Sequence, residues 1–106
     1  MVRGKPIKLR IRLTSKGTGL PIGADLVSDI LLDLFSTADR TVVKSISIAS
    51  GGVTKESDGV FLLEVASADT LKLPKTGTAY LQGWAEPVHE SVTINLGQMK
   101  TNIKNG

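Results

Sequence analysis

The chain has 106 residues, of which 41% are hydrophobic and 22% charged, and its formal net charge is +3. This length suffices for one hydrophobic core, and the apolar content excludes an intrinsically disordered chain. The lack of cysteine excludes disulfides and thiolate metal sites. We therefore expect a single domain over residues 1–106, with its core over about residues 5–99 and a polar tail over residues 100–106.

The N-terminal region, MVRGKPIKLR, does not have the pattern of a secretory signal. It carries basic residues but no apolar stretch and no cleavage site. No run approaches the 18 apolar residues of a membrane-spanning helix. These features predict a cytoplasmic chain with no membrane partner. An export signal removed from a longer precursor is the alternative.

The first predicted element is a strand from Pro6 to Leu13. Apolar and basic side chains alternate along it: Ile7, Leu9, Ile11 and Leu13 on one side, and Lys8, Arg10 and Arg12 on the other. A period of two places the aliphatic side chains on one face of a strand and the cations on the other. The segment therefore predicts a half-buried strand with a cationic outer face.

Residues 24–35, ADLVSDILLDLF, allow two interpretations. Their apolar residues fit a helical spacing, and Leu and Asp are mediocre strand formers. From Ser28 to Phe35, however, Ile30, Leu32 and Leu34 recur at every second position. Because the surrounding segments all have strand patterns and a glycine-rich loop precedes this one, we predict a strand and keep the helix as the alternative.

The rest of the chain predicts more strands, over residues 41–49, 53–55, 60–65, 78–85 and 91–99. Turn-forming residues separate them, with Gly59 placed for a positive φ. One helical turn is expected near residues 67–72, with Ser67 as its N-cap. About seven strands with glycine and proline turns between them predict an all-β fold, either an antiparallel sandwich or a small barrel.

Residues that could carry catalysis are scarce. His89 is the single histidine and lies in a Pro-Val-His-Glu loop, with no cysteine in the chain to pair with it. The glycines at 17, 19 and 23 do not form a phosphate-binding loop before a helix. The aspartates are too widely spaced for a calcium loop. We therefore predict a non-enzymatic chain with no catalytic, cofactor-binding or metal-binding residues and no small-molecule substrate.

The distribution of charge suggests how the first two strands meet. Asp29 and Asp33 share one face of the second strand, as Lys8, Arg10 and Arg12 do on the first. We expect the two aspartates to lie beside the three cations as cross-strand pairs. The alternative is that the cations form a nucleic-acid surface. Aromatic residues make up only 4% of the chain and none lies near the basic strand, so we do not expect a nucleic-acid partner.

Tyr80 and Trp84 also share one strand face, because their spacing is even. In a small sandwich such aromatic residues usually belong to the core, which is the interpretation we prefer. If they are exposed instead, they would form the platform of a carbohydrate-binding or adhesin-like module. Together with Lys8, Arg10 and Arg12, they are the candidate residues of an interaction face.

Three segments resemble the N-terminal immunoglobulin-like domain of phage baseplate upper proteins and related tail proteins. They are KLRIRLTSKGTGLPIGADLVSDILLDLF, the GVFLLEV strand and SADTLKLPKTGTAYLQGWAE. The family's Gly-x-Pro turn, alanine-containing gate segment and Gly-x-Tyr turn correspond to Gly19-Leu-Pro21, Ala24 and Gly77-Thr-Ala-Tyr80. Ile22-Gly23 replaces the acidic residue and leucine that often follow the family's first turn.

The resemblance covers about residues 5–98 and implies an immunoglobulin-like antiparallel β-sandwich. It also implies a structural part of a virion or prophage, which works through protein–protein contacts. The partners would be copies of the same chain, in a homo-oligomer, or neighbouring tail and baseplate proteins. The family has no catalytic residues to carry over.

Overall fold

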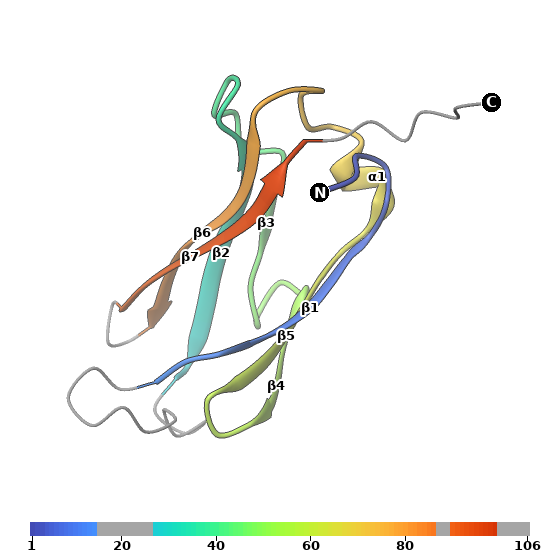
Figure 1. Ribbon diagram of the computed structural model, residues 1–106. Coiled ribbons are helices and arrows are strands. Elements are labelled where there is room, and N and C mark those ends of the chain that lie inside the picture. Colours follow the sequence, from blue (N-terminus) through green and yellow to red (C-terminus); the bar gives the residue numbers. More distant parts are fainter. Residues whose placement is uncertain (15–26, 87–89, 100–106) are drawn as a thin grey trace.

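The chain folds into two antiparallel sheets packed face to face (Figure 1). The computed structural model describes residues 1–14, 27–86 and 90–99. The elements in chain order are β1 (Ile7–Arg12), β2 (Asp29–Ser36), β3 (Lys44–Ile46), β4 (Val53–Ser57), β5 (Val60–Val65), α1 (Ser67–Thr70), β6 (Thr78–Glu86) and β7 (Glu90–Gln98). The predicted all-β sandwich with one helical turn is confirmed.

The order of strands is that of an immunoglobulin-like sandwich. One sheet has the order β1-β5-β4 and the other β3-β2-β6-β7. If β1 takes the place of immunoglobulin strand B, then β5 and β4 correspond to E and D, and β2, β6 and β7 to C, F and G. In the part of the chain that the structure describes, no strand takes the place of strand A. Among the described strands, β1 is therefore at the edge of its sheet.

The hydrophobic core lies between the two sheets. In β1, Ile7, Leu9 and Ile11 face inward opposite Val65, Leu63 and Phe61 of β5. Phe61 and Leu63 are fully buried, as are Ile30, Leu34 and Leu81 of the other sheet. Each side chain of this size contributes about 1.5–3 kcal/mol on full burial. The period-two pattern that predicted β1 therefore also identifies its core face.

The segment that allowed a helix is strand β2. Ile30, Leu32 and Leu34 are buried, whereas Leu31 and Asp33 between them are exposed, which is the alternation of a strand. β2 pairs with β3 on one side and β6 on the other. The alternation from Ile30 to Leu34 is thus the signal that decided between the two interpretations.

The strand predicted over residues 41–49 is shorter than expected. Only Lys44–Ile46 is strand, because the chain turns on both sides of it. Before β3, Arg40 adopts a left-handed conformation with φ 59°. After β3, the amide of Ile48 donates to a side-chain carboxylate oxygen of Asp29 at 2.7 Å, and not to the backbone of β2. Local β propensity did not reveal these two turns.

The helical turn is present at Ser67–Thr70, but Ser67 is not its N-cap. Ala66 occupies that position, and no side-chain hydrogen bond caps the turn. Thr70 anchors it instead. Its Oγ1 accepts a hydrogen bond from the amide of Gly4 at 2.9 Å and lies 3.0 Å from the carbonyl oxygen of Lys5. The turn is therefore stabilised by contact with the N-terminal segment.

The expected pairing of the aspartates with the cations of β1 is wrong. β1 and β2 belong to different sheets, so their outer faces point in opposite directions. Arg10 instead pairs with Glu56 of β4, within its own sheet. Asp33 accepts a hydrogen bond from Ser45 Oγ at 2.6 Å. The charge pattern misled because consecutive strands of a sandwich need not be neighbours.

Several features singled out in the sequence lie outside the described residues: the Gly19-Leu-Pro21 turn, Ile22-Gly23, Ala24, His89 and the tail over residues 100–106. In the described chain, Gly77 has φ 89° and directly precedes β6, as expected of the turn that starts this strand.

Candidate interaction face

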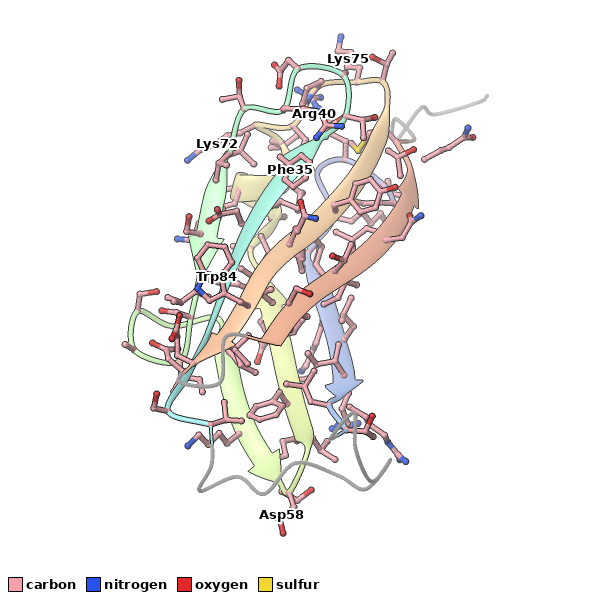
Figure 2. All side chains as sticks on the ribbon, turned by 90° about the vertical axis from the view of Figure 1, so that its left-hand side faces the viewer. Phe35, Arg40, Asp58, Lys72, Lys75 and Trp84 are labelled. Carbon is pink, nitrogen blue, oxygen red and sulfur yellow. The ribbon has the colours of Figure 1, made fainter. Side chains whose placement is uncertain are left out.

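The outer side of the β3-β2-β6-β7 sheet carries exposed aromatic and aliphatic side chains (Figure 2). The strand register places its outward side chains in three rows that run across β2, β6 and β7. The rows are Leu31–Trp84–Ser91, Asp33–Gln82–Thr93 and Phe35–Tyr80–Asn95. We call these nine residues the outer face. Two rows with aromatic side chains thus flank a polar row.

Trp84 is a surface residue, so its assignment to the core is wrong. Its side chain is 44% exposed, while Ala79, Leu81 and Ala85 of the same strand are fully buried. The core-facing positions of β6 are therefore the odd-numbered ones. Even spacing correctly placed Tyr80 and Trp84 on one face, and that face points to solvent.

The other two aromatic residues of the outer face, Phe35 and Tyr80, are more enclosed than Trp84. The rings of Phe35 and Tyr80 are stacked, with their centroids 5.9 Å apart and an interplanar angle of 25°. Phe35 is only 9% exposed, although it points outward from β2. Stacked aromatic pairs contribute roughly 0.5–1.5 kcal/mol beyond the burial of their area. This pair therefore makes one end of the outer face rigid.

The central row supplies hydrogen-bonding groups. Asp33 is held by the hydroxyl of Ser45, and the amide nitrogen of Gln82 donates to Thr93 Oγ1 at 3.4 Å. All four side chains are exposed. A carboxylate, an amide and two hydroxyl groups therefore present both donors and acceptors to a ligand.

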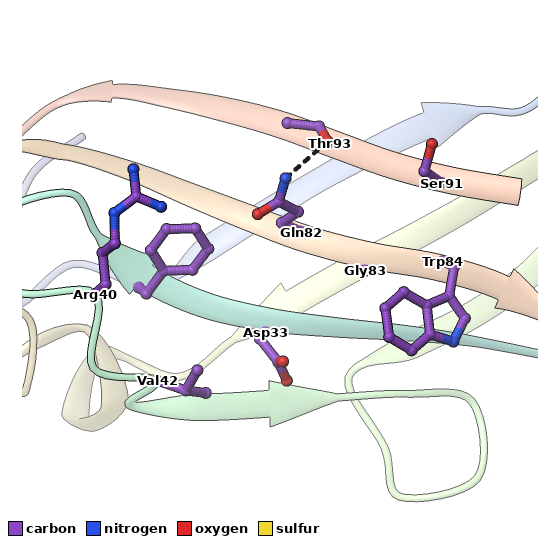
Figure 3. A pocket seen from close by; sticks show the side chains of 9 residues that line it. Asp33, Arg40, Val42, Gln82, Gly83, Trp84, Ser91 and Thr93 are labelled. Atoms are coloured by element: carbon purple, nitrogen blue, oxygen red, sulfur yellow. Dashed lines mark hydrogen bonds between the residues drawn. The ribbon is translucent and has the colours of Figure 1, made fainter.

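A hollow of about 360 Å³ lies between the exposed tryptophan and the turn that follows β2 (Figure 3). Its lining comprises Asp33, Phe35, Arg40, Val42, Gln82, Gly83, Trp84, Ser91 and Thr93. A second hollow, of about 270 Å³, adjoins it at Phe35, Arg40, Gln82 and Thr93. The two together form one open groove along the outer face, and the Arg40 side chain borders both.

The groove is suited to binding by stacking, apolar contact and hydrogen bonding. Among the described residues, no three His, Cys, Asp or Glu side chains are grouped as they would be around a metal ion. The lining residues contain no histidine or cysteine that could serve as a base or nucleophile.

The predicted interaction residues do not form one site. Lys8, Arg10 and Arg12 lie on the outer side of one sheet, and Tyr80 and Trp84 on the outer side of the other. This separation leaves the basic strand without the aromatic platform that the nucleic-acid alternative requires.

Arg10 is also engaged by its own sheet. Its guanidinium binds Glu56 in a bidentate manner, with Nη2 donating to Oε2 at 3.2 Å. The hydrogen bond and charge of Glu56 raise the pKa of Arg10, and the hydrogen bond from Arg10 lowers the pKa of Glu56. The bond therefore favours the charged form of both groups.

Several residues of the outer face and its groove were not anticipated. The outward position of Gln82 follows from its even spacing with the exposed Trp84 on the same strand. The exposure of Leu31 follows from the burial of Ile30 and Leu32 on either side of it. Arg40 and Val42 carry no such signal, because they belong to an irregular segment that the tertiary structure folds against β2.

No protein-family model, curated protein or solved structure matches the chain. No helix in the described residues has the length and apolar character needed to cross a membrane. The case for a function therefore rests on the outer face.

Proposed function

We propose that the protein is a non-enzymatic assembly module, of the kind found in phage or prophage tails and baseplates, and that it docks a protein partner on its outer face. One observation carries this proposal. Of the four large hydrophobic side chains that are exposed in the described chain, Leu31, Val42 and Trp84 gather on this side of the molecule, at 40%, 45% and 44% exposure. Grouped exposed apolar side chains typically mark an interface.

The composition of the groove fits a protein interface better than a random surface. Tryptophan and arginine are the residues that most often dominate binding energy, and Trp84 and Arg40 line the same hollow. The polar side chains of Gln82 and Thr93 lie between them and can bond to a partner's backbone. A second copy of the chain is the first partner to test, since two outer faces can pack symmetrically.

The test is the oligomeric state as a function of concentration, measured by analytical ultracentrifugation. We expect the natural chain to self-associate and Trp84→Ala to weaken association by about 30-fold, the loss typical of a binding hot spot. Leu71→Ala is the matched control, because Leu71 is 50% exposed but does not line the groove. This variant should associate like the natural chain.

Two results would contradict the proposal. One is a natural chain that stays monomeric at high concentration and has no affinity for tail proteins. The other is an equal effect of Trp84→Ala and Leu71→Ala. Thermal unfolding of both variants checks that neither result arises from a loss of fold.

A carbohydrate-binding module is the second candidate, and the position of Trp84 favours it. The exposed indole lies beside the carboxylate, amide and hydroxyl groups of the central row. A sugar ring can stack on such a side chain while its hydroxyls bond to Asp33 and Gln82. Because Trp84 is the single tryptophan, its fluorescence reports directly on binding. A glycan array that shows binding abolished in both Trp84→Ala and Gln82→Ala would favour this function over protein docking.

A further inference from the structure

Among the described strands, β1 is the edge of its sheet, and one side of its backbone faces no other described strand. The amide of Leu13 donates to the carbonyl oxygen of Gly59 at 2.7 Å, in line with the register of β1 and β5. Antiparallel pairing alternates, so the even-numbered residues turn their N–H and C=O groups to the opposite side. These residues are Lys8, Arg10 and Arg12, and no strand of the described chain lies on that side.

The interior side of β1 is incompletely covered. Leu9 and Ile11 face the core but are only partly buried. Their partners on β5, Leu63 and Phe61, are fully buried. Apolar side chains that face the core but remain partly exposed indicate that no element of residues 1–14, 27–86 and 90–99 fully covers this margin of the sandwich.

Core-facing side chains are also incompletely buried on β7, the neighbouring edge strand of the opposite sheet (Figure 1). Ile94 and Leu96 are only partly buried, whereas Leu81, opposite Ile94 on β6, is fully buried. At one end, the N-terminal segment that leads into β1 reaches β7, where the amino group of Met1 donates to the carbonyl oxygen of Gln98 at 3.0 Å. A strand added along β1 would cover Leu9 and Ile11 on the interior side of this edge.

The other edges are less suited to pairing. β3 has three residues, and the pairing of β4 is irregular between Lys55 and Ser57. The pairing register of β7 with β6 shifts between Ala79 and Tyr80, and Gly97 of β7, opposite Ala79, has φ 91°. Bulges and short strands are the usual protection of sheet edges. β1 has six residues in unbroken register.

The charge of β1 decides which strand can pair with it. Two copies of β1 paired with each other would bring their cations face to face, which is unfavourable. In the described chain, Arg10 is paired with Glu56, and neither Lys8 nor Arg12 has an ion-pair partner. An acidic strand, in contrast, would place carboxylates beside these two cations.

We propose that the β1 edge accepts an extended strand from another protein, in which apolar residues alternate with Asp or Glu. Its backbone pairs with Lys8, Arg10 and Arg12, which is strand addition to a sheet edge. Its apolar side chains cover Leu9 and Ile11, and its carboxylates face the two unpaired cations. This inference rests on the proposed assembly function. It adds a second binding surface to the outer face and specifies the class of partner that this second surface binds.

The test uses two blocked peptides of about seven residues, the length that spans β1. One alternates valine with glutamate and the other valine with lysine. We expect the glutamate peptide to slow the amide exchange of Lys8, Arg10 and Arg12 in the isotope-labelled full chain, and to bind roughly tenfold more tightly than the lysine peptide.

A charge reversal sharpens the test. Lys8→Glu/Arg12→Glu should invert the preference, so that this variant binds the lysine peptide more tightly. The matched control is Lys72→Glu/Lys75→Glu, which changes the net charge equally at two exposed positions between α1 and β6. It should keep the preference of the natural chain.

Three outcomes would overturn the inference: equal affinity for both peptides, no preference change in the reversed variant, or no protection of the β1 amides. If the peptide instead perturbs only residues around Trp84, strand addition is excluded while docking on the outer face stands. If Trp84→Ala abolishes self-association but the glutamate peptide still protects β1, both proposals stand independently.

Discussion

The carbonyl oxygen of Leu31 lies 1.7 Å from the position that a Cβ atom on Gly83 would occupy. The backbones of β2 and β6 therefore approach each other at this point more closely than any side chain allows. Trp84, the next residue, lies opposite Leu31 in the register. Gly83 thus permits the close pairing of the two central strands on which the outer face is built.

Replacement of Gly83 by alanine should destabilise the fold by roughly 2–3 kcal/mol, because the clash is with backbone that cannot rotate away. Chemical denaturation measures the loss. Gly51→Ala is the control: it introduces a side chain at φ 105° but meets no atom within 4 Å. It should cost about 1 kcal/mol, the penalty for that conformation alone. Equal losses in the two variants would contradict the close approach.

Thr70 should be sensitive to loss of its hydroxyl. It is fully buried and connects α1 to the N-terminal segment through Gly4 and Lys5. Thr70→Val keeps the shape but leaves these backbone groups without a partner, which costs about 1–3 kcal/mol. Faster amide exchange at Gly4 should accompany the loss. Thr70→Ser keeps the hydroxyl and should cost less than Thr70→Val, and the opposite ranking would refute the role of the hydrogen bonds.

The stacked rings of Phe35 and Tyr80 should be energetically coupled. A double-mutant cycle with Phe35→Ala and Tyr80→Ala, measured by urea denaturation, should give a coupling of roughly 0.5–1.5 kcal/mol. The single variants should each lose stability, since either change removes the contact. Additivity within about 0.3 kcal/mol would show that the contact contributes nothing specific.

The Arg10–Glu56 pair should make stability depend on pH in the acidic range. Because the hydrogen bond from Arg10 lowers the pKa of Glu56 below its ordinary value of 4.5, the folded state is favoured above that value. The contribution is lost as the pH falls from 4.5 through the lower pKa of the folded chain. Urea midpoints across this range should therefore fall less steeply in Glu56→Gln than in the natural chain.

Glu64→Gln is the control for this prediction, because Glu64 is an exposed carboxylate of the neighbouring strand β5. Because this variant keeps the Arg10–Glu56 pair, it should retain the loss of stability in acid that the pair produces. If Glu56→Gln and Glu64→Gln give the same profile, the ion pair does not contribute to stability.

Local patterns predicted the strands well where polar and apolar residues alternate. The alternation of Ile7 to Leu13 gave both the position of β1 and its core face, because a period of two is a property of the strand itself. The alternation within residues 28–35 likewise identified β2 against a competing helical spacing. Gly59 and Gly77 marked turns because their positive φ favours glycine.

The same patterns could not say which strands are neighbours. Asp29 and Asp33 face away from the cations of β1 because β2 crosses to the opposite sheet. The parity of Tyr80 and Trp84 showed that they share a face, but not which face. In β6 both sides carry apolar residues, so only packing against the other sheet decides that Leu81 is buried and Trp84 is exposed.

The sequence by itself therefore determined an all-β chain, most of its strands and the cationic face of β1, because these depend on short-range periodicity and turn chemistry. Only the tertiary structure decided the two features on which our two proposals rest. The exposed groove around Trp84 and the uncovered edge of β1 both arise from how distant strands are arranged in two sheets, and that arrangement is set by burial of the whole core at once.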